Sequence, residues 1–168
     1  MSKIVLVDDD PNILSALQRA LLQGWPGPDR PQIESFTNPF DALNRICVCE
    51  FDLIICDYMM PQMSGGELLQ ALRDVAPDTV RIMLSGSATF DTVLSAINEA
   101  QAFRFLRKPW DAKELLETVR LGLEQRAALL AAKAPAPLTP QELEARRLEA
   151  EEPGLLTVRR DANGSVIL

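Results

Sequence analysis

The sequence predicts an α/β fold in which five short strands form one parallel sheet covered by helices on both faces. Short apolar runs rich in β-branched residues alternate with longer segments whose apolar residues recur at helical spacing. Most of these runs are apolar throughout, as expected of strands that are buried on both faces. Five repeats of strand and helix over residues 1–130 therefore predict a doubly wound (βα)5 arrangement.

Capping signals support the predicted order of strands and helices. Strands are predicted at 4–7, 33–36, 52–56, 80–84 and 102–106, and helices at 11–23, 38–47, 64–72, 90–100 and 111–130. The first helix opens with Pro11, which suits a first helical turn, after Asp10 as the N-cap. Asn38 precedes the second helix, and Asp111 is predicted to cap the long final helix.

The composition changes after residue 130, where a linker and a small C-terminal region are predicted. We divide the chain into a domain at 1–130, a Pro/Ala linker at 131–138 and a C-terminal region at 139–168. Thr139 and Glu142 have capping-box spacing, so a helix is predicted from there to about Glu152. Residues 155–160 and 165–168 can pair as a β-hairpin through the polar turn between them.

Composition and charge limit the functions that this chain can have. Of its 168 residues, 47% are hydrophobic and 24% are charged, which suits a globular domain with a buried core. The formal net charge is −7 and there is no basic stripe, so no direct nucleic-acid partner is expected. No apolar run reaches the length of a membrane span, so no membrane insertion is expected. Three cysteines indicate a reducing compartment, hence the cytoplasm, and the absence of histidine excludes histidine-based catalysis.

Polar side chains follow four of the predicted strands. Asp8 and Asp9 follow the first strand, and Asp57 follows the third. Ser85 follows the fourth strand, and Lys108 comes shortly after the fifth. Ligands of open parallel sheets bind outside the carboxyl ends of the strands. A purely structural role does not require acids, a hydroxyl and an ammonium at one edge, so a functional site is predicted there.

Five short segments at these strand ends form a recognisable set. They are Val-Asp-Asp-Asp-Pro-Asn at 7–12, Ile-Cys-Asp-Tyr-Met-Met-Pro at 55–61 followed by Ser64-Gly65, Leu-Ser-Gly-Ser-Ala at 84–88, Phe-Arg-Phe-Leu at 103–106 and Arg-Lys-Pro-Trp at 107–110. Over roughly residues 3–125 the chain thereby resembles the receiver domains of bacterial two-component response regulators. The resemblance implies a flavodoxin-like receiver fold, with a cis bond between Lys108 and Pro109.

The resemblance also implies a phosphoacceptor and a magnesium site. Asp57 would be the nucleophile that accepts a phosphoryl group, and a carboxylate needs no general base for this. Mg²⁺, which prefers oxygen ligands, would be held by Asp9, Asp57 and the backbone carbonyl of Met59, with Asp8 acting mainly through a water. The cation would relieve the repulsion among the carboxylates, and Lys108 would place a positive charge on a phosphoryl oxygen.

A switch and a set of partners follow from the same resemblance. Ser85 would be the switch hydroxyl that hydrogen-bonds the phosphoryl group, and Phe105 would be the switch aromatic that moves with it. The phosphoryl donor would be a sensor histidine kinase or a phosphotransfer protein. The output surface would be the face of the fourth helix, fifth strand and fifth helix, which contacts a downstream protein target not identified by the sequence.

The C-terminal region does not identify how the protein passes on its signal. It has no basic DNA-reading character and no catalytic motif, so we expect a regulator that is not an enzyme and has no DNA-binding output domain. An isolated hairpin is marginal in water. The predicted hairpin could therefore dock on its own or a twin receiver, giving a homodimer, or fold on a partner, or belong to an ordinary flexible extension.

Two other functions fit part of the pattern. Haloacid-dehalogenase-like phosphatases also use an aspartyl phosphate and Mg²⁺, and Asp8-x-Asp10 with Ser85 imitates part of their pattern. The hydroxyl residue that usually follows that motif is missing, and Asp57 would have no role. The other alternative is a receiver-like interaction module that no longer takes phosphate, which the complete set of site residues argues against.

Overall fold

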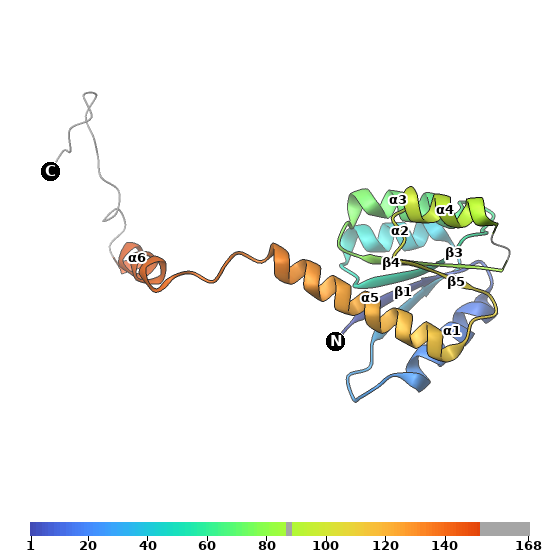
Figure 1. Ribbon diagram of the computed structural model, residues 1–168, viewed down its shortest axis with the longest axis horizontal. Coiled ribbons are helices and arrows are strands. Elements are labelled where there is room, and N and C mark those ends of the chain that lie inside the picture. Colours follow the sequence, from blue (N-terminus) through green and yellow to red (C-terminus); the bar gives the residue numbers. More distant parts are fainter. Residues whose placement is uncertain (87–88, 152–168) are drawn as a thin grey trace, which may run out of the picture. The chain divides into compact units, whose positions relative to one another are not determined.

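The computed structural model describes residues 1–86 and 89–151, and its elements alternate along the chain as predicted (Figure 1). The strands are β1 (Lys3–Val7), β2 (Gln32–Phe36), β3 (Leu53–Asp57), β4 (Val80–Ser85) and β5 (Arg104–Arg107). The helices are α1 (Pro11–Gly24), α2 (Pro39–Val48), α3 (Gly65–Val75), α4 (Phe90–Asn98), α5 (Ala112–Lys133) and α6 (Pro140–Glu151). All five predicted repeats of strand and helix are present.

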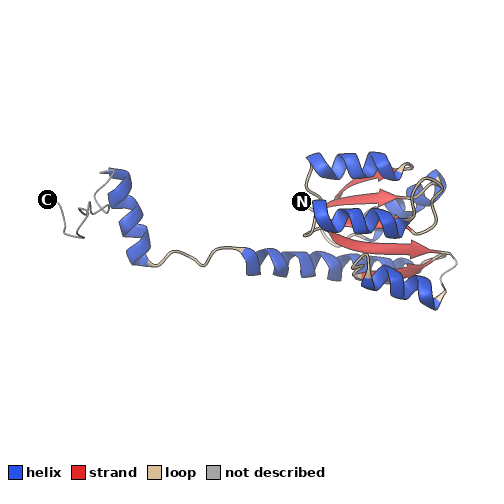
Figure 2. Ribbon diagram, turned by 90° about the horizontal axis from the view of Figure 1, so that it is seen from above, coloured by secondary structure: helices blue, strands red, loops and turns tan. Residues whose placement is uncertain are grey.

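The five strands form a single parallel sheet in the order β2-β1-β3-β4-β5. This order confirms the doubly wound, flavodoxin-like arrangement, because the chain runs outward from β1 in both directions. Figure 2 shows the strands side by side with helices in front of and behind them. The carboxyl ends of β1, β3 and β4 consequently lie next to one another at one edge of the sheet.

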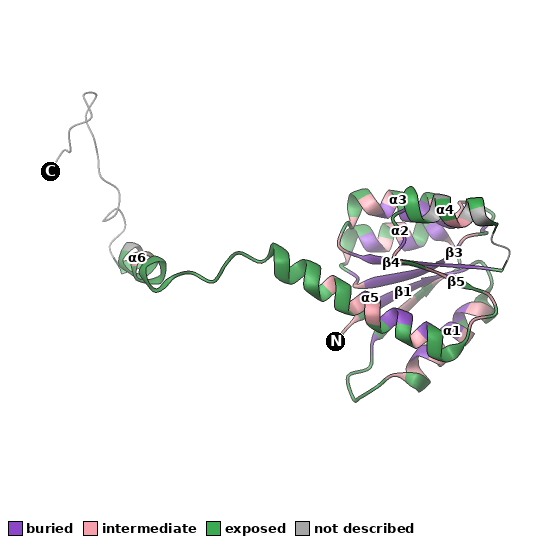
Figure 3. Ribbon diagram, in the orientation of Figure 1, coloured by how far each residue is buried: buried purple, intermediate pink, exposed green. Residues whose placement is uncertain are grey.

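Successive residues of each strand face opposite sides of the sheet, which gives the domain two hydrophobic cores. Val5 and Ile54 belong to the core under α2 and α3, whereas Ile4 and Leu53 belong to the core under α1 and α5. Figure 1 shows α2, α3 and α4 on one side of the sheet and α1 and α5 on the other. Figure 3 shows the buried strands between these two layers, so the sheet is a rigid platform for groups at its edge.

Side-chain caps hold the turns from strand to helix. The carboxylate of Asp10 accepts a hydrogen bond from the backbone of Asn12, and Asn38 caps α2 in the same way. The carboxylate of Asp111 accepts hydrogen bonds from the first turn of α5. These three caps confirm the sequence prediction, and each contributes about 1 kcal/mol to helix stability. A fourth, the capping box of Ser64 and Glu67 at α3, was not predicted.

Most predicted elements begin or end one to three residues away from their bounds in the structure. Strand β5 begins at Arg104 rather than at 102, and α4 ends at Asn98 rather than at 100. Gln101 has a φ of 49°, in the left-handed region, so the chain turns between these two elements. Helix α5 continues to Lys133, so the first residues of the predicted linker are helical.

The chain divides into two compact units, Met1–Ala132 and Lys133–Leu168. Within the second unit, α6 opens with the predicted capping box: the backbone N–H of Thr139 donates to Glu142 at 2.7 Å, and that of Glu142 donates to the Thr139 hydroxyl at 3.3 Å. The predicted hairpin at 155–168 lies outside the described residues. Across residues 1–86 and 89–151, every helix is too short or too polar to cross a membrane.

Candidate functional site

Three carboxylates meet where β1 and β3 end. Asp8 and Asp9 directly follow β1, and Asp57 is the last residue of β3. One carboxylate oxygen from each lies within 4.8 Å of the other two. Asp8 and Asp57 are buried, whereas Asp9 is exposed at the rim. The structure therefore brings together the three acids that the sequence analysis placed at this edge.

Lys108 reaches the same cluster from the end of β5. Its backbone N–H donates to the carbonyl of Ser85, which brings the segment after β5 close to the end of β4. Its Nζ lies 2.6 Å from Oδ2 of Asp8 and 3.1 Å from Oδ1 of Asp57. The bond between Lys108 and Pro109 is cis, as the resemblance implied. One ammonium thus pairs with two of the three carboxylates in the cluster, which leaves an excess of negative charge for a cation to balance.

The electrostatics of the cluster follow from burial and from this pairing. Burial raises the pKa of Asp57, and the hydrogen bond and charge of Lys108 oppose that rise without cancelling it. Burial acts to lower the pKa of Lys108, but its hydrogen bonds and charge interactions with Asp8 and Asp57 outweigh burial and raise it. The ammonium therefore stays charged, and Asp57 is a carboxylate held in a poorly solvated position.

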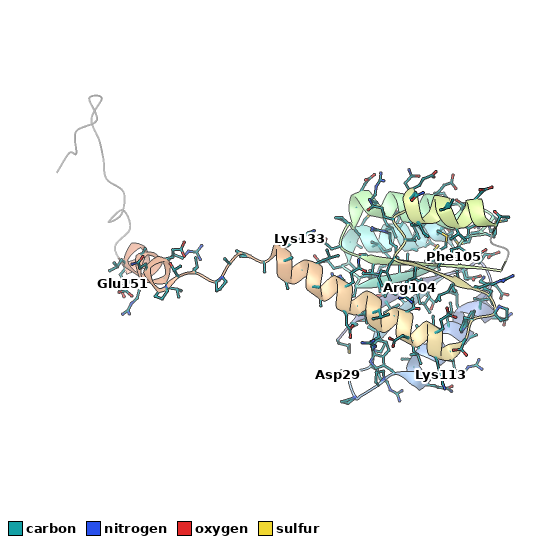
Figure 4. All side chains as sticks on the ribbon, in the orientation of Figure 1. Asp29, Arg104, Phe105, Lys113, Lys133 and Glu151 are labelled. Carbon is teal, nitrogen blue, oxygen red and sulfur yellow. The ribbon has the colours of Figure 1, made fainter. Side chains whose placement is uncertain are left out.

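The other predicted site residues take different positions. Ser85, at the end of β4, is fully buried, and Phe105 pairs with Met83 within the outermost strand β5, before the carboxyl end of that strand. Phe105, labelled on β5 in Figure 4, is partly buried against the core under α2 and α3. The side chain of Met59 is 66% exposed, while its backbone N–H donates to the Asp57 carboxylate. Residues 87–88 of the fourth motif lie outside the described residues.

Asp10 does not add to the acid cluster in the way that the phosphatase alternative requires. Its carboxylate caps α1 by accepting from Asn12 at 2.8 Å. Its backbone N–H donates to Asp8 at 2.9 Å, which fixes the buried Asp8 carboxylate at the turn. Asp57, which that alternative leaves without a role, instead lies with Asp8 and Asp9.

Gly65, which the sequence analysis named within a motif but gave no structural role, is a structural requirement of the site. Its backbone N–H donates to the carbonyl of Tyr58 at 2.8 Å, which folds the loop after Asp57 back on itself. A Cβ atom at this position would lie 2.2 Å from the Asp57 carbonyl oxygen and 2.9 Å from the Cα of Tyr58. The sequence signal was present, because a glycine directly follows the N-cap Ser64.

Gly65→Ala is expected to destabilise the protein by roughly 1–3 kcal/mol, because the added methyl group meets backbone rather than a movable side chain. Urea denaturation measures the change in the free energy of unfolding. Gly66→Ala is the matched control: the nearest atom to its Cβ is 3.5 Å away, so the helix propensity of alanine should leave stability equal or higher. Equal losses in the two variants would contradict the close approach at Gly65.

Fold and site together define a doubly wound α/β protein with an acidic, lysine-paired site at the carboxyl edge of its sheet. A model of the family described as the response regulator receiver domain matches residues 4–120. The chain therefore belongs to the receiver domain family of two-component response regulators. Receiver domains typically bind Mg²⁺ at an acidic pocket, and Asp8, Asp9 and Asp57 form such a cluster here. They are generally not enzymes in the usual sense, and they interact with histidine kinases or phosphotransfer proteins.

Curated relatives are response regulators of greater length. The chain is 33% identical to the response regulator protein PilR of Pseudomonas aeruginosa over 124 residues, 74% of this chain and 26% of that protein. It is 31% identical to the hydrogenase transcriptional regulatory protein HoxA of Bradyrhizobium diazoefficiens, covering 72% of this chain and 24% of that protein. The chain thus spans about a quarter of the length of these relatives.

Solved structures agree in fold. The signal receiver domain of an HD domain-containing protein from Pseudomonas fluorescens Pf-5 is 35% identical, with a TM-score of 0.69 over 76% of this chain and 98% of that one. The beryllofluoride-activated NtrC4 receiver domain, solved as a dimer, is 26% identical, with a TM-score of 0.68 over 75% of this chain and 99% of that one.

Proposed function

We propose that this receiver domain is a phosphorylation switch in which Asp57 accepts a phosphoryl group from a sensor histidine kinase or a phosphotransfer protein. The observation that carries the proposal is the position of Asp57. It lies within 4.8 Å of two other carboxylates and 3.1 Å from the ammonium of Lys108, at the carboxyl edge of a parallel sheet. That combination suits charge-neutralised phosphoryl transfer, in which positioning and electrostatics supply most of the rate.

The residues present fit a magnesium ion. The donors are all oxygens, as a hard cation requires, and the cluster carries more negative than positive charge. Asp9 and Asp57 would hold the ion with the backbone carbonyl of Met59, and Asp8 would act mainly through a water. When bound, Mg²⁺ would neutralise charge that otherwise disfavours the approach of an anionic phosphoryl group.

Phosphoryl transfer to Asp57 requires little of the protein beyond positioning the reacting groups. An oxygen of Asp57 forms the new P–O bond while the P–N bond of the donor phosphohistidine breaks, and the imidazole nitrogen keeps the bonding electron pair. Asp57 needs no base because it reacts as a carboxylate. Lys108 lies close enough to Asp57 to move its ammonium onto a phosphoryl oxygen, and that ion pair would replace the one it makes now.

The conformational change would then pass from β4 to β5. Ser85 would donate its hydroxyl to the phosphoryl group and draw the end of β4 toward Asp57, and Phe105 would turn to follow. Direct pairing of β4 and β5 supports this coupling, because Lys108 and Ser85 share a backbone hydrogen bond. The face of α4, β5 and α5 would be the output surface for a downstream protein or for a second copy of the chain.

We also place this chemistry in the cytoplasm, where thiols stay reduced. Cys47, Cys49 and Cys56 are all free thiols, and burial holds the pKa of the Cys56 thiol well above its usual value, so that this thiol is an inert core group.

Intact-protein mass spectrometry after incubation with Mg²⁺ and acetyl phosphate tests the proposal. Wild-type protein should gain one phosphoryl group, and Asp57→Asn or chelation of the metal should abolish the gain. Asp10→Asn is the matched control, because Asn caps a helix as well as Asp and Asp10 is engaged at α1. If wild-type protein gains nothing under conditions where a reference receiver reacts, the chain is a phosphate-independent interaction module.

A further inference from the structure

A second charged group lies buried far along the sheet from the acidic edge. Arg81 is in β4, four residues before Ser85, and is buried, with a relative exposure of 7%. A buried guanidinium is costly unless its charge and its N–H groups are paired. The partners of its N–H groups therefore indicate whether Arg81 has only a structural role in the core.

Arg81 has almost no partner of its own. Its Nη1 donates to the carbonyl of Thr79 at a long 3.3 Å, and its Nε is buried with no hydrogen-bond partner. Among residues 1–86 and 89–151, no carboxylate lies within ion-pair distance of it. Burial, reinforced by the positive charge of Arg73, lowers the pKa of Arg81. The positive charge of Arg73 thus adds to the free-energy cost of burying the Arg81 guanidinium.

Arg81 is one of the residues that line a cavity of about 360 Å³ at the start of β4 and β5. That volume lies in the range of small-molecule sites. Its lining residues include the polar Gln101 and Gln125 and the apolar Ile97, Phe103 and Leu129. Ile97 and Leu129 are among the exposed large hydrophobic side chains of the domain, so an occupant would cover apolar surface as well as meet the cation.

The charge of the cavity selects among anions. A single guanidinium supplies one positive charge in a planar fork, which matches a carboxylate through two parallel hydrogen bonds. Asp78 also lines the cavity, and the chain as a whole carries a net charge of −7, so a phosphate or sulfate dianion is disfavoured. The apolar walls favour an acid with a nonpolar body.

We infer that this cavity is a binding site for a small organic monocarboxylate with an apolar body, held by Arg81. It is separate from the acidic edge and does not depend on phosphorylation of Asp57. Its walls come from α4, the segment before β5, and α5, so an occupant would contact the elements that form the proposed output surface.

Titration of the full chain with benzoate, in the presence of a metal chelator and at constant ionic strength, tests the inference. Proton–nitrogen correlation spectra should show saturable shifts at residues 78–81, 97–103 and 125–129, including the Arg81 side-chain N–H. Arg81→Met should weaken binding by roughly thirtyfold or more, because it removes the charged partner of a buried carboxylate. Shifts that do not saturate, or that persist in Arg81→Met, would overturn the proposal.

Two controls separate the alternatives. Arg104→Met removes an exposed arginine from the neighbouring strand β5, labelled in Figure 4, and should leave benzoate binding unchanged. Arg81→Lys keeps the charge but loses the planar fork, so it should bind more weakly than wild type even if the methionine variant folds poorly. Saturable binding of inorganic phosphate in place of benzoate at the same residues would overturn the assignment to carboxylates.

Discussion

Lys108→Met is expected to slow phosphorylation of Asp57 by roughly 10²–10³-fold, the usual cost of removing one preorganised charge from a transfer site. In the structure this ammonium is the positive partner of both buried carboxylates, at 2.6 Å from Asp8 and 3.1 Å from Asp57. A phosphoryl group arriving at Asp57 brings further negative charge to the same place. Without Lys108, Mg²⁺ alone would have to neutralise the negative charge of the carboxylates and of the phosphoryl group.

The rate is measured by following incorporation of phosphate from acetyl phosphate at saturating Mg²⁺. Lys113→Met is the matched control, since Lys113 is an exposed lysine at the start of α5 and its loss should leave the rate unchanged. Far-ultraviolet circular dichroism checks that both variants are folded. A Lys108→Met rate within threefold of wild type would mean that the lysine only balances charge in the resting protein.

The fold could be predicted from the sequence because its strands are apolar on both faces and its helices carry their own caps. The pairing of Asp8 with Asp57 also followed from the predicted flavodoxin-like fold, since both lie at the ends of strands that are neighbours in that strand order. Lys108 is harder, because its contact with the acids depends on the turn after β5: its place after the fifth strand indicated the edge, and the resemblance indicated its role. These predictions rest on local patterns and on one general rule of topology.

The features that the sequence analysis missed depend on packing between distant segments. Gly65 must be glycine because of the Asp57 carbonyl, a contact that no periodicity in the chain reveals. Arg81 lies within a strand predicted to be apolar, and it lines a cavity together with residues far away in the sequence, which no local pattern reveals. Tertiary contacts therefore decide the role of both residues.

Asp9→Asn is expected to remove about half or more of the stabilisation that Mg²⁺ gives to the folded protein. A ligand that binds only the folded state at 100 times its dissociation constant adds about 2.7 kcal/mol to the free energy of unfolding. Asp9 is the exposed carboxylate of the cluster and pairs with no lysine in the structure, so its charge is available to a cation. Losing that charge should weaken Mg²⁺ binding by about tenfold or more, reducing the gain at the same concentration to about 1.4 kcal/mol.

Thermal or urea unfolding with and without Mg²⁺ measures this gain directly. Asp9 is exposed, so the amide should change the stability of the metal-free protein little, and any loss can be assigned to the ion. Asp10→Asn again provides the comparison, because it removes an adjacent carboxylate that already serves as a helix cap and should keep the full response. If the two variants respond equally to Mg²⁺, the ion is held by Asp8 and Asp57 alone, and the proposed ligand set is wrong. If only Asp9→Asn loses the response, the exposed acid at the rim controls whether the buried carboxylates can take up their cation.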